Sequence, residues 1–360
     1  MFNRRELALA RLLAQGLIAP AGDAVAAVDR SVAMQGQDLP GVLASAALRS
    51  ASGQVSEVLA ALAAGRLVRG YPMRGTVFLL TAADAAWVTS LCAGPALRAQ
   101  IARRPALGLD QAQLDLAAES SLEALSDGPL SRSALFERWE RSGLSCAGGR
   151  GYHQLSHLIM SGLVCFGPWN GVDQDVVLAE LWLPPGGTLA ARFGGDRIPA
   201  VAELLLRYLT GHGPATIRDF AWWTKLPLRE IRAALPAVTD RLENDGEAEP
   251  SYWRPGLRDE VAQLVGKAAP TLLLPGFDEY ILGYRDRTFA MTPQQHELLV
   301  PGNNGVFRKT VLQAGQAVGV WRRGGRPGRR TLEIEEFEPL SARVRAAAQR
   351  SFAAFPFVGD

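Results

Sequence analysis

The feature that most constrains the fold is a pattern of helices followed by paired strands, which we interpret as recurring three times. In the first copy, helices with apolar residues at helical spacing lead to strands at 66–69 and 76–80, with a turn at 70–72. The second and third copies each open on a Gly-Pro pair with a capping hydroxyl two residues later, at Ser131 and Thr216. Helices followed by a hairpin are the order of a winged helix-turn-helix, which is a DNA-docking module.

The last quarter of the chain changes character. Strands are expected there at 271–275, 306–312, 317–321 and 331–337. Gly-rich turns join them, and a helix at 341–352 closes the chain. This pattern predicts a small β-barrel or sheet that carries one helix.

Composition bounds the possible classes of protein. The chain has 360 residues, 48% hydrophobic and 21% charged, which is a normal balance for a globular protein of two or three domains. No stretch approaches the roughly 18 uninterrupted apolar residues of a membrane span. The three cysteines are widely spaced, which argues against a disulfide framework and for a reducing, cytoplasmic location. The net charge is only +2, so any DNA-binding surface must be local.

Two neutral amides, Gln35 and Gln37, stand two residues apart in a short turn between helices. In an extended turn, side chains with this spacing point to the same side. An unpaired buried amide costs roughly 1–3 kcal/mol, so core packing does not account for the pair. One interpretation is a site that holds a water molecule or a base edge. The other is a polar loop at the end of a helix.

A second candidate site is the segment 322–330, which carries five arginines and no acid between two predicted strands. Arginines on a Gly/Pro tip suit DNA phosphates or a groove, with binding that weakens as salt rises. The alternative is a solvated hairpin tip. The five residues are Arg322, Arg323, Arg326, Arg329 and Arg330.

Other polar groups of the sequence are candidates for catalysis or metal binding. Asp278 and Tyr280 follow an apolar strand and are secondary candidates, with Asp278 as a base. The alternative is that one of the adjacent carboxylates, Asp278 or Glu279, caps the next element or forms an ion pair, for example with Arg285 or Arg287. His153 and His157 have the spacing of two metal ligands on one helix face, but no third ligand is evident, so no metal is expected. The chain also lacks a nucleophile elbow, a P-loop and a dinucleotide fingerprint, so no cofactor is expected.

Several blocks, taken in order, resemble the AlkZ/YcaQ superfamily of bacterial winged-helix DNA glycosylases. The blocks are Gln35-Gly36-Gln37, Met73-Arg74-Gly75-Thr76, Gly213 to Trp223, Leu273 to Tyr280, and Phe307 to Trp321. The resemblance extends over essentially the whole chain. The Gln-x-Gln form is typical of the AlkZ branch, whereas the YcaQ branch has Gln-x-Asp. Two positions depart from the family pattern, because Gly36 replaces an aliphatic residue and Phe78 stands where a histidine is common.

The resemblance implies an α+β fold of three tandem winged helices and a C-terminal β-barrel, arranged as a C-shaped DNA clamp. The expected domains are 1–95 with the catalytic turn, 96–195, 196–265 and 266–360. It also implies a monofunctional glycosylase that excises N7-alkylated guanines, including bulky adducts or interstrand crosslinks, in DNA repair or in self-resistance to a genotoxic natural product. Gln35 and Gln37 are then the catalytic residues.

The chemistry of such a base explains how neutral amides suffice. Alkylation at N7 makes guanine cationic and a good leaving group, and its departure leaves an oxocarbenium-like sugar. We expect Gln37 to position the attacking water and Gln35 to fix that water or the sugar-phosphate. Arg74 on the first wing and the five arginines at 322–330 are the expected DNA contacts.

Two other functions fit the same modules. A non-catalytic DNA-binding protein, either a regulator or a drug-sequestering protein, would use the glutamines to read bases, because Gln pairs bidentately with adenine. A structural array would contact protein instead. DNA binding with a steep salt dependence separates the first two functions from the third. The expected partner is duplex DNA with alkylated guanine, bound by a monomer that contacts no membrane.

Overall fold

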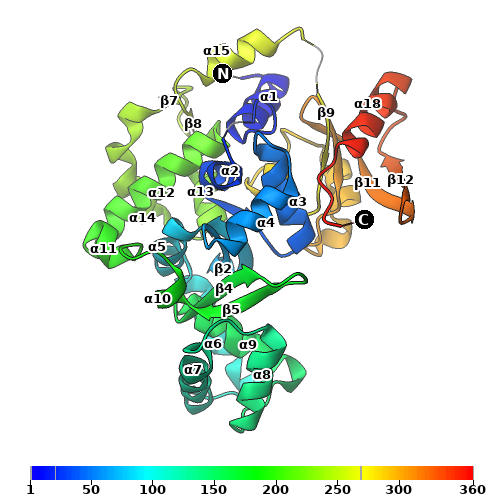
Figure 1. Cartoon of the computed structure of the whole chain (residues 1–360). Coiled ribbons are helices and arrows are strands. Elements are labelled where there is room, and N and C mark those ends of the chain that lie inside the picture. Colours follow the sequence, from blue (N-terminus) through cyan, green and yellow to red (C-terminus); the bar gives the residue numbers. More distant parts are fainter. Residues whose placement is uncertain (1, 21, 268–269, 360) are drawn as a thin grey trace. The chain divides into compact units, whose positions relative to one another are not determined.

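The computed structural model describes residues 2–20, 22–267 and 270–359. The chain is a mixed α/β protein that divides into two compact units (Figure 1). Unit 1 comprises Met1–Val58, Ala202–Trp223 and Pro227–Asp360, so it joins the two ends of the chain. Unit 2 comprises Leu59–Val201 and Thr224–Leu226.

The helices follow the apolar periodicity of the sequence. Asn3 and Glu6 form the reciprocal capping box that begins α1. The helices are α1 Arg4–Ala14, α2 Ala24–Ser31, α3 Leu39–Arg49, α4 Val55–Ala63, α5 Ala82–Cys92, α6 Gly94–Leu107, α7 Gln111–Leu125, α8 Arg132–Arg141, α9 Arg150–Met160, α10 Ala179–Trp182, α11 Leu189–Phe193, α12 Arg197–His212, α13 Ile217–Thr224, α14 Leu228–Ala234, α15 Leu257–Leu264, α16 Glu279–Leu282, α17 Pro293–Leu299 and α18 Ala342–Ala353. Among the described residues, no helix is long and apolar enough to cross a membrane.

Most strands are short, and the paired strands run antiparallel to each other. They are β1 Ala33–Gln35, β2 Leu67–Met73, β3 Thr76–Thr81, β4 Val164–Trp169, β5 Gln174–Leu178, β6 Ala215–Thr216, β7 Glu243–Asn244, β8 Ser251–Trp253, β9 Thr271–Leu274, β10 Thr310–Gln313, β11 Gln316–Arg326 and β12 Arg329–Glu336. In unit 2, four strands lie in the order β3-β2-β4-β5. In unit 1, one sheet has the order β6-β8-β7 and another the order β12-β11-β10-β9.

The predicted first hairpin exists as β2 and β3, but its turn lies at Arg74 and Gly75 rather than at 70–72. Both turn residues have positive φ, which a tight hairpin turn requires. The register shifts between Gly70 and Met73, so Pro72 occupies an irregular part of β2. A proline in a strand is tolerated at such a bulge because no ladder hydrogen bond is needed there.

Unit 2 contains helices followed by a hairpin, as predicted for the second module. Trp139 of α8 and Leu155 of α9 share one hydrophobic core with Val164 and Val176 of the hairpin β4–β5. The second of these strands ends at Leu178, and residues 179–182 form α10 instead of continuing the strand. The number of winged-helix modules and the four domain boundaries remain predictions.

The third predicted module contains a short pair of strands, β7 and β8, which follow α14. Residues 239–241 form a 3-10 turn before them. Val238 and Leu242 flank this turn, and both side chains are buried.

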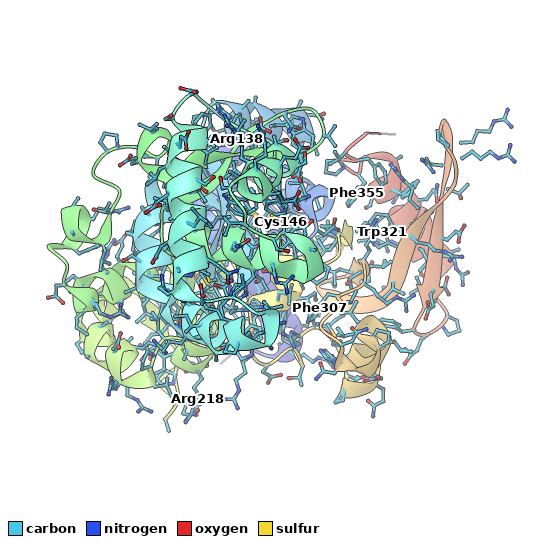
Figure 2. All side chains as sticks on the ribbon, turned by 90° about the horizontal axis from the view of Figure 1, so that it is seen from below. Arg138, Cys146, Arg218, Phe307, Trp321 and Phe355 are labelled. Atoms are coloured by element: carbon cyan, nitrogen blue, oxygen red, sulfur yellow. The ribbon has the colours of Figure 1, made fainter. Side chains whose placement is uncertain are left out.

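The C-terminal sheet is open, with β12 and β9 at its edges. The predicted closed β-barrel is thus not confirmed, since the four strands do not return on one another. One face packs on α18, where Trp321 of β11 meets Phe352, and the ring of Phe355 lies 5.0 Å from that of Trp321 (Figure 2). This packing fixes the sheet to the C-terminal helix.

Candidate active site

The Gln turn, defined as residues 35–38, joins β1 to α3 in unit 1. Gln35 is buried with 5% of its surface exposed, whereas Gln37 is exposed. The Nε2 of Gln35 donates a hydrogen bond to the Oε1 of Gln37 over 3.0 Å. The two amides therefore lie on the same side of the turn, as their spacing predicts. One amide is anchored inside the protein, and the other reaches solvent.

The entry to the Gln turn is held by burial. Val32, which ends α2, has a φ of 64° and is fully buried. A positive φ is unfavourable for a β-branched residue and persists only where the surrounding structure enforces it. Met34 is also buried, and β1 contacts α2, α3 and α16. The backbone that presents Gln35 is therefore constrained from three helices.

The exit from the Gln turn is held by a buried ion pair, which we call the α3 clamp and define as Ser45, Arg49 and Asp278. The guanidinium of Arg49 donates to both carboxylate oxygens of Asp278 over 2.8 and 2.9 Å. Ser45 Oγ donates to Asp278 Oδ2 over 2.6 Å, and Arg49 also donates over 2.8 Å to Gln15, the residue that follows α1. The side chains of Arg49 and Asp278 are 0% and 1% exposed. The helix that follows the glutamines is thus bound to both ends of the chain.

The contacts of Asp278 are therefore those of a residue that stabilises the fold. Besides Arg49 and Ser45, its carboxylate accepts the backbone N–H of Tyr280 over 2.9 Å and caps α16. Burial by itself raises the pKa of Asp278, but the charge and hydrogen bonds of Arg49, with the bonds from Ser45 and Tyr280, hold the pKa below its usual value. The alternative interpretation, a carboxylate that caps the next element or forms an ion pair, matches this geometry, because Asp278 does both.

The expected partners of that ion pair were wrong. Arg285 and Arg287 were proposed because they are near in sequence, but Asp278 pairs with Arg49, 229 residues away. Arg287 donates to the backbone carbonyl of Ile281 instead, and its guanidinium lies 5.1 Å from the ring of Trp222. A contact of this range leaves no local signal in the sequence.

Tyr280, the other secondary candidate, is also internal. Its hydroxyl lies 2.9 Å from the carbonyl oxygen of Gly315, and burial raises its pKa well above the ordinary value. Glu279 beside it is 1% exposed and accepts a hydrogen bond from Trp223 Nε1 over 2.6 Å. Trp223 is thus a core residue, and the segment 278–280 supports the fold under the Gln turn.

Arg74 lies at the tip of the β2–β3 hairpin in unit 2. Its guanidinium carbon is 5.7 Å from the ring of Phe78, which is fully buried. Lys225, an exposed residue that the sequence did not single out, lies near enough for electrostatic coupling: burial lowers its pKa first, and the charge of Arg74 lowers it further. A second cation, from the segment after α13, therefore lies near Arg74 of the first wing.

The basic hairpin, defined as residues 322–330, is paired as two antiparallel strands almost to its tip. Its strands continue to Arg326 and from Arg329, and Pro327-Gly328 makes the turn, with a φ of 73° at Gly328. Arg322 pairs with Glu333 over 2.5 Å. Arg326 and Arg329 face each other in register, both exposed. Within the described chain, no ion pair neutralises either of these two.

The remaining two arginines are partly engaged. Arg323 donates to the carbonyl oxygen of Gly359 over 3.3 Å, and Arg330 donates to the carbonyl oxygen of Gly325 over 2.9 Å. The five candidates of the hairpin are therefore not equivalent. Arg326 and Arg329 are the best placed to meet an anion, because like charges face each other there without a protein counter-ion.

The histidine pair lies inside unit 2. Burial, followed by the charge of Arg104, lowers the pKa of His157 to about 4, and the same causes lower that of His153. The Nδ1 of His157 is 3.1 Å from a guanidinium nitrogen of Arg104. Across the described ranges, no group of three or more His, Cys, Asp or Glu side chains is placed to hold a metal ion.

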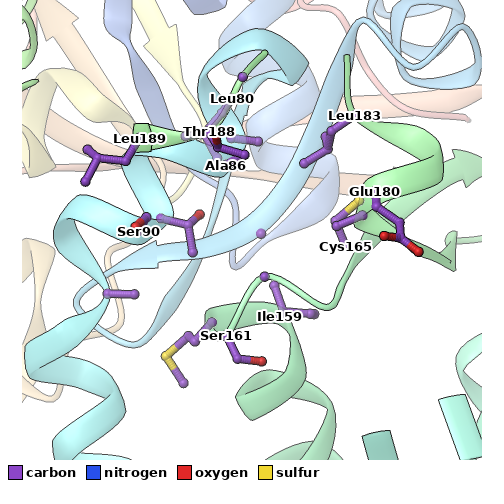
Figure 3. Close-up of a pocket in the computed structure, with 18 of the residues that line it drawn as sticks. Leu80, Ala86, Ser90, Ile159, Ser161, Cys165, Glu180, Leu183, Thr188 and Leu189 are labelled. Atoms are coloured by element: carbon purple, nitrogen blue, oxygen red, sulfur yellow. The ribbon is translucent and has the colours of Figure 1, made fainter. Parts of the chain in front are cut away.

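A separate cavity of about 760 Å³ lies within unit 2 (Figure 3). Its walls are mainly apolar, with Leu80 and Leu189 on one side and Ile159 opposite, while Glu180 lies at one edge. Neither glutamine of the turn lines it. The Gln turn and this cavity are therefore separate features of the molecule.

Sequence reasoning missed the residues that hold the site, Ser45 and Arg49. Both lie on α3 four residues apart, so they share one helix face. The available signal was a charged side chain on a helix that is otherwise small and apolar, directly after the Gln turn. Such a residue is seldom fully buried unless it is paired.

Comparison with known proteins places the chain in a family. An interstrand DNA cross-link repair glycosylase of Streptomyces sahachiroi is 27% identical over 300 residues, which are 76% of this chain and 75% of that protein. The solved structure of the Streptomyces sahachiroi DNA glycosylase AlkZ has the same fold, with a TM-score of 0.73 and 23% identity over 100% of this chain and 99% of that one. The family model of AlkZ-like DNA glycosylases matches residues 28–355. The chain therefore belongs to the AlkZ-like DNA glycosylase family.

Proposed function

We propose that this protein hydrolyses the N-glycosidic bond of cationic N7-alkylguanine in duplex DNA, including bulky adducts and interstrand crosslinks. Family membership supports glycosylase chemistry, and the curated relative is named for interstrand cross-link repair. The observation that carries the assignment of the site is the bonded pair of amides, one buried and one exposed. Removal of such lesions serves DNA repair or self-resistance to a genotoxic natural product.

The substrate class follows from what two amides can do. Neither glutamine can donate a proton as a general acid, so the leaving base must depart without one. An N7-alkylated guanine meets this requirement because its positive charge makes it a good leaving group. The developing oxocarbenium ion then needs an oriented water and nearby acceptor oxygens. We therefore expect no release of neutral bases such as uracil.

Gln35 and Gln37 take different parts in this mechanism. A glutamine carbonyl oxygen has two lone pairs, and the N–H of Gln35 occupies one of those on Gln37 Oε1. The second can accept a hydrogen bond from the attacking water. Gln35, held by the buried strand β1, thus fixes the orientation of the Gln37 amide. Orientation of this kind reduces the entropy cost of reaching the transition state.

The exposure of Gln37 suits lesions that are hard to extrude. A crosslinked base is attached to the opposite strand, so it is difficult to flip into a closed pocket. Gln37 is the exposed residue of the turn and does not line the cavity of unit 2. A catalytic amide on the surface can instead approach the sugar while the base stays near the duplex.

The test is release of base from a duplex with a single 7-methylguanine and, in parallel, from a nitrogen-mustard crosslink. Abasic sites are revealed by alkaline cleavage for the wild type and for Gln35→Ala/Gln37→Ala. We expect the rate to fall by about 10²-fold or more in the double variant, a loss of roughly 2.7 kcal/mol of transition-state stabilisation. Strand cleavage should require alkali, because a monofunctional enzyme leaves the abasic site intact.

Two controls make the result specific. Gln263→Ala removes an exposed glutamine from α15 and should leave the rate unchanged. Gln37→Ala alone should lower the rate more than Gln35→Ala alone, since Gln35 acts by orienting Gln37. Base release that survives the double variant would reject the Gln turn as the site. Tight DNA binding without release from either lesion would favour the non-catalytic DNA-binding function.

A further inference from the structure

A basic recess, defined by Arg5, Lys267, Arg343 and Arg350, lies in unit 1, and none of the candidate site residues considered so far lines it. It has a volume of about 710 Å³. Arg5 comes from α1, Lys267 from the segment after α15, and the other two arginines from α18. In Figure 1, α18 runs beside β9, and residues of both elements line the recess.

The charge of this recess has one sign. All four cationic residues are exposed, and the described lining contains no Asp or Glu. None of the four side chains forms an ion pair with another described residue. Arg345 on the same helix differs in this respect, because Glu336 binds its guanidinium over 2.6 Å. The recess therefore holds four positive charges without a protein counter-ion.

Polar and small apolar residues complete the lining of the recess. Ser351 Oγ donates to the carbonyl oxygen of Thr271 over 2.7 Å, and the Thr271 hydroxyl donates to the side chain of Gln313. Both hydroxyl protons are therefore used within the protein, and the charged donors that remain for an anion are those of the three arginines and Lys267. Guanidinium and ammonium groups are the donors that recur where proteins bind phosphate.

We propose that the basic recess binds phosphate groups of a DNA strand, as a contact surface separate from the Gln turn and the basic hairpin. Like charges gathered without acids repel one another, and a polyanion relieves that repulsion. The DNA source of the phosphate follows from the family, whose members are DNA glycosylases. The recess carries no sequence information, because phosphate contacts position a protein on DNA but do not specify bases.

The experiment measures affinity of the full-length protein for an undamaged 25-base-pair duplex at a series of salt concentrations. The variant is Arg343→Gln/Arg350→Gln, and the matched control is Arg345→Gln on the same helix. Each phosphate contact contributes about 0.9 to the slope of log K against log salt. We expect the double variant to lower this slope by about 1.8 and the control to change it by much less.

Undamaged DNA keeps this test independent of glycosylase activity, so a failure of the proposed catalytic mechanism would not affect it. Circular dichroism and thermal unfolding check that α18 stays folded in all variants. A slope equal to that of the wild type in the double variant would overturn the proposal. Pyrophosphate, added to the wild type and to the double variant, tests for a small-anion site. If the double variant kept the wild-type slope but lost a pyrophosphate-induced rise in Tm, the recess would bind small anions, and the proposal would also be overturned.

Discussion

Removal of one member of the α3 clamp should destabilise the protein far more than removal of an exposed ion pair. In Asp278→Leu, the Arg49 guanidinium stays buried without its carboxylate, and such an uncompensated charge costs about 3–5 kcal/mol. Arg49→Met leaves the carboxylate of Asp278 unpaired and should cost a similar amount. Because about 1 kcal/mol shifts Tm by roughly 2–4 °C in a domain of this size, either change should lower the Tm of unit 1 by about 6–20 °C.

The double variant Arg49→Met/Asp278→Leu isolates the interaction. With both charges gone, no buried charge is left uncompensated, and apolar replacements of a buried ion pair are often nearly neutral. Gln15, Ser45 and the N–H of Tyr280 each lose one hydrogen bond in every variant that removes their partner, so this cost is already counted in the single variants. The Nε of Arg49 is itself buried without a hydrogen-bond partner among the described residues, which further lowers the net contribution of the wild-type pair. The double variant should therefore lose less stability than the sum of the single variants, by about 2 kcal/mol or more.

Urea unfolding followed by near-UV circular dichroism measures these free energies. The control pair is Arg218 and Glu249, which also lies in unit 1 but is 43% and 64% exposed. Exposed pairs contribute about 0–1 kcal/mol, so Glu249→Leu should have a small effect. The reasoning would be refuted if Asp278→Leu cost no more than Glu249→Leu, or if the two single changes at the clamp were additive.

Two further predictions concern surface charge and pH. Arg326→Gln/Arg329→Gln should lower the salt slope of DNA binding by about 1.8. Arg322→Gln should lower this slope less, because Glu333 already pairs with that guanidinium. Equal slopes for both variants in a salt titration would contradict this ranking. The pKa of His157 in the folded protein is about 4, below its ordinary value. As the pH falls, the unfolded chain therefore binds this proton before the folded protein does. The contribution of neutral His157 to the free energy of unfolding is lost as the pH falls from about 6.5 towards about 4. Urea unfolding of His157→Gln should show a flatter pH dependence than the wild type over that range.

Local signals in the sequence predicted the elements well. The capping hydroxyls at Ser131 and Thr216 act within a few residues, and each accepts a backbone N–H from the first turn of its helix. The strands expected at 271–275, 317–321 and 331–337 are present, whereas the strand expected at 306–312 begins only at Thr310. The errors also have local causes. Gly70-Tyr71-Pro72 has the composition of a turn, but a bulge in β2 accommodates the proline and moves the turn to Arg74-Gly75.

Long-range contacts were beyond the reach of such signals. Four strands with Gly-rich turns are compatible with a barrel or a sheet, and only the pairing of their edges decides between them. The spacing of Gln35 and Gln37 predicted that the amides share a side, but not that one is buried and bonded to the other. The Arg49–Asp278 pair joins residues from the two ends of the chain, so no window of sequence contains it.

This long-range clamp bears directly on how two neutral amides can catalyse a reaction. A carboxylate would stabilise a developing positive charge even when poorly placed, because Coulomb attraction falls slowly with distance. An amide offers only a dipole, so its contribution depends on orientation. The buried Gln35, the strained φ of Val32 and the α3 clamp all restrict the backbone on either side of Gln37. If the proposed mechanism holds, the charge-free clamp variant should recover most of its stability yet release base more slowly than the wild type, since apolar side chains restore packing but not the fixed position of α3.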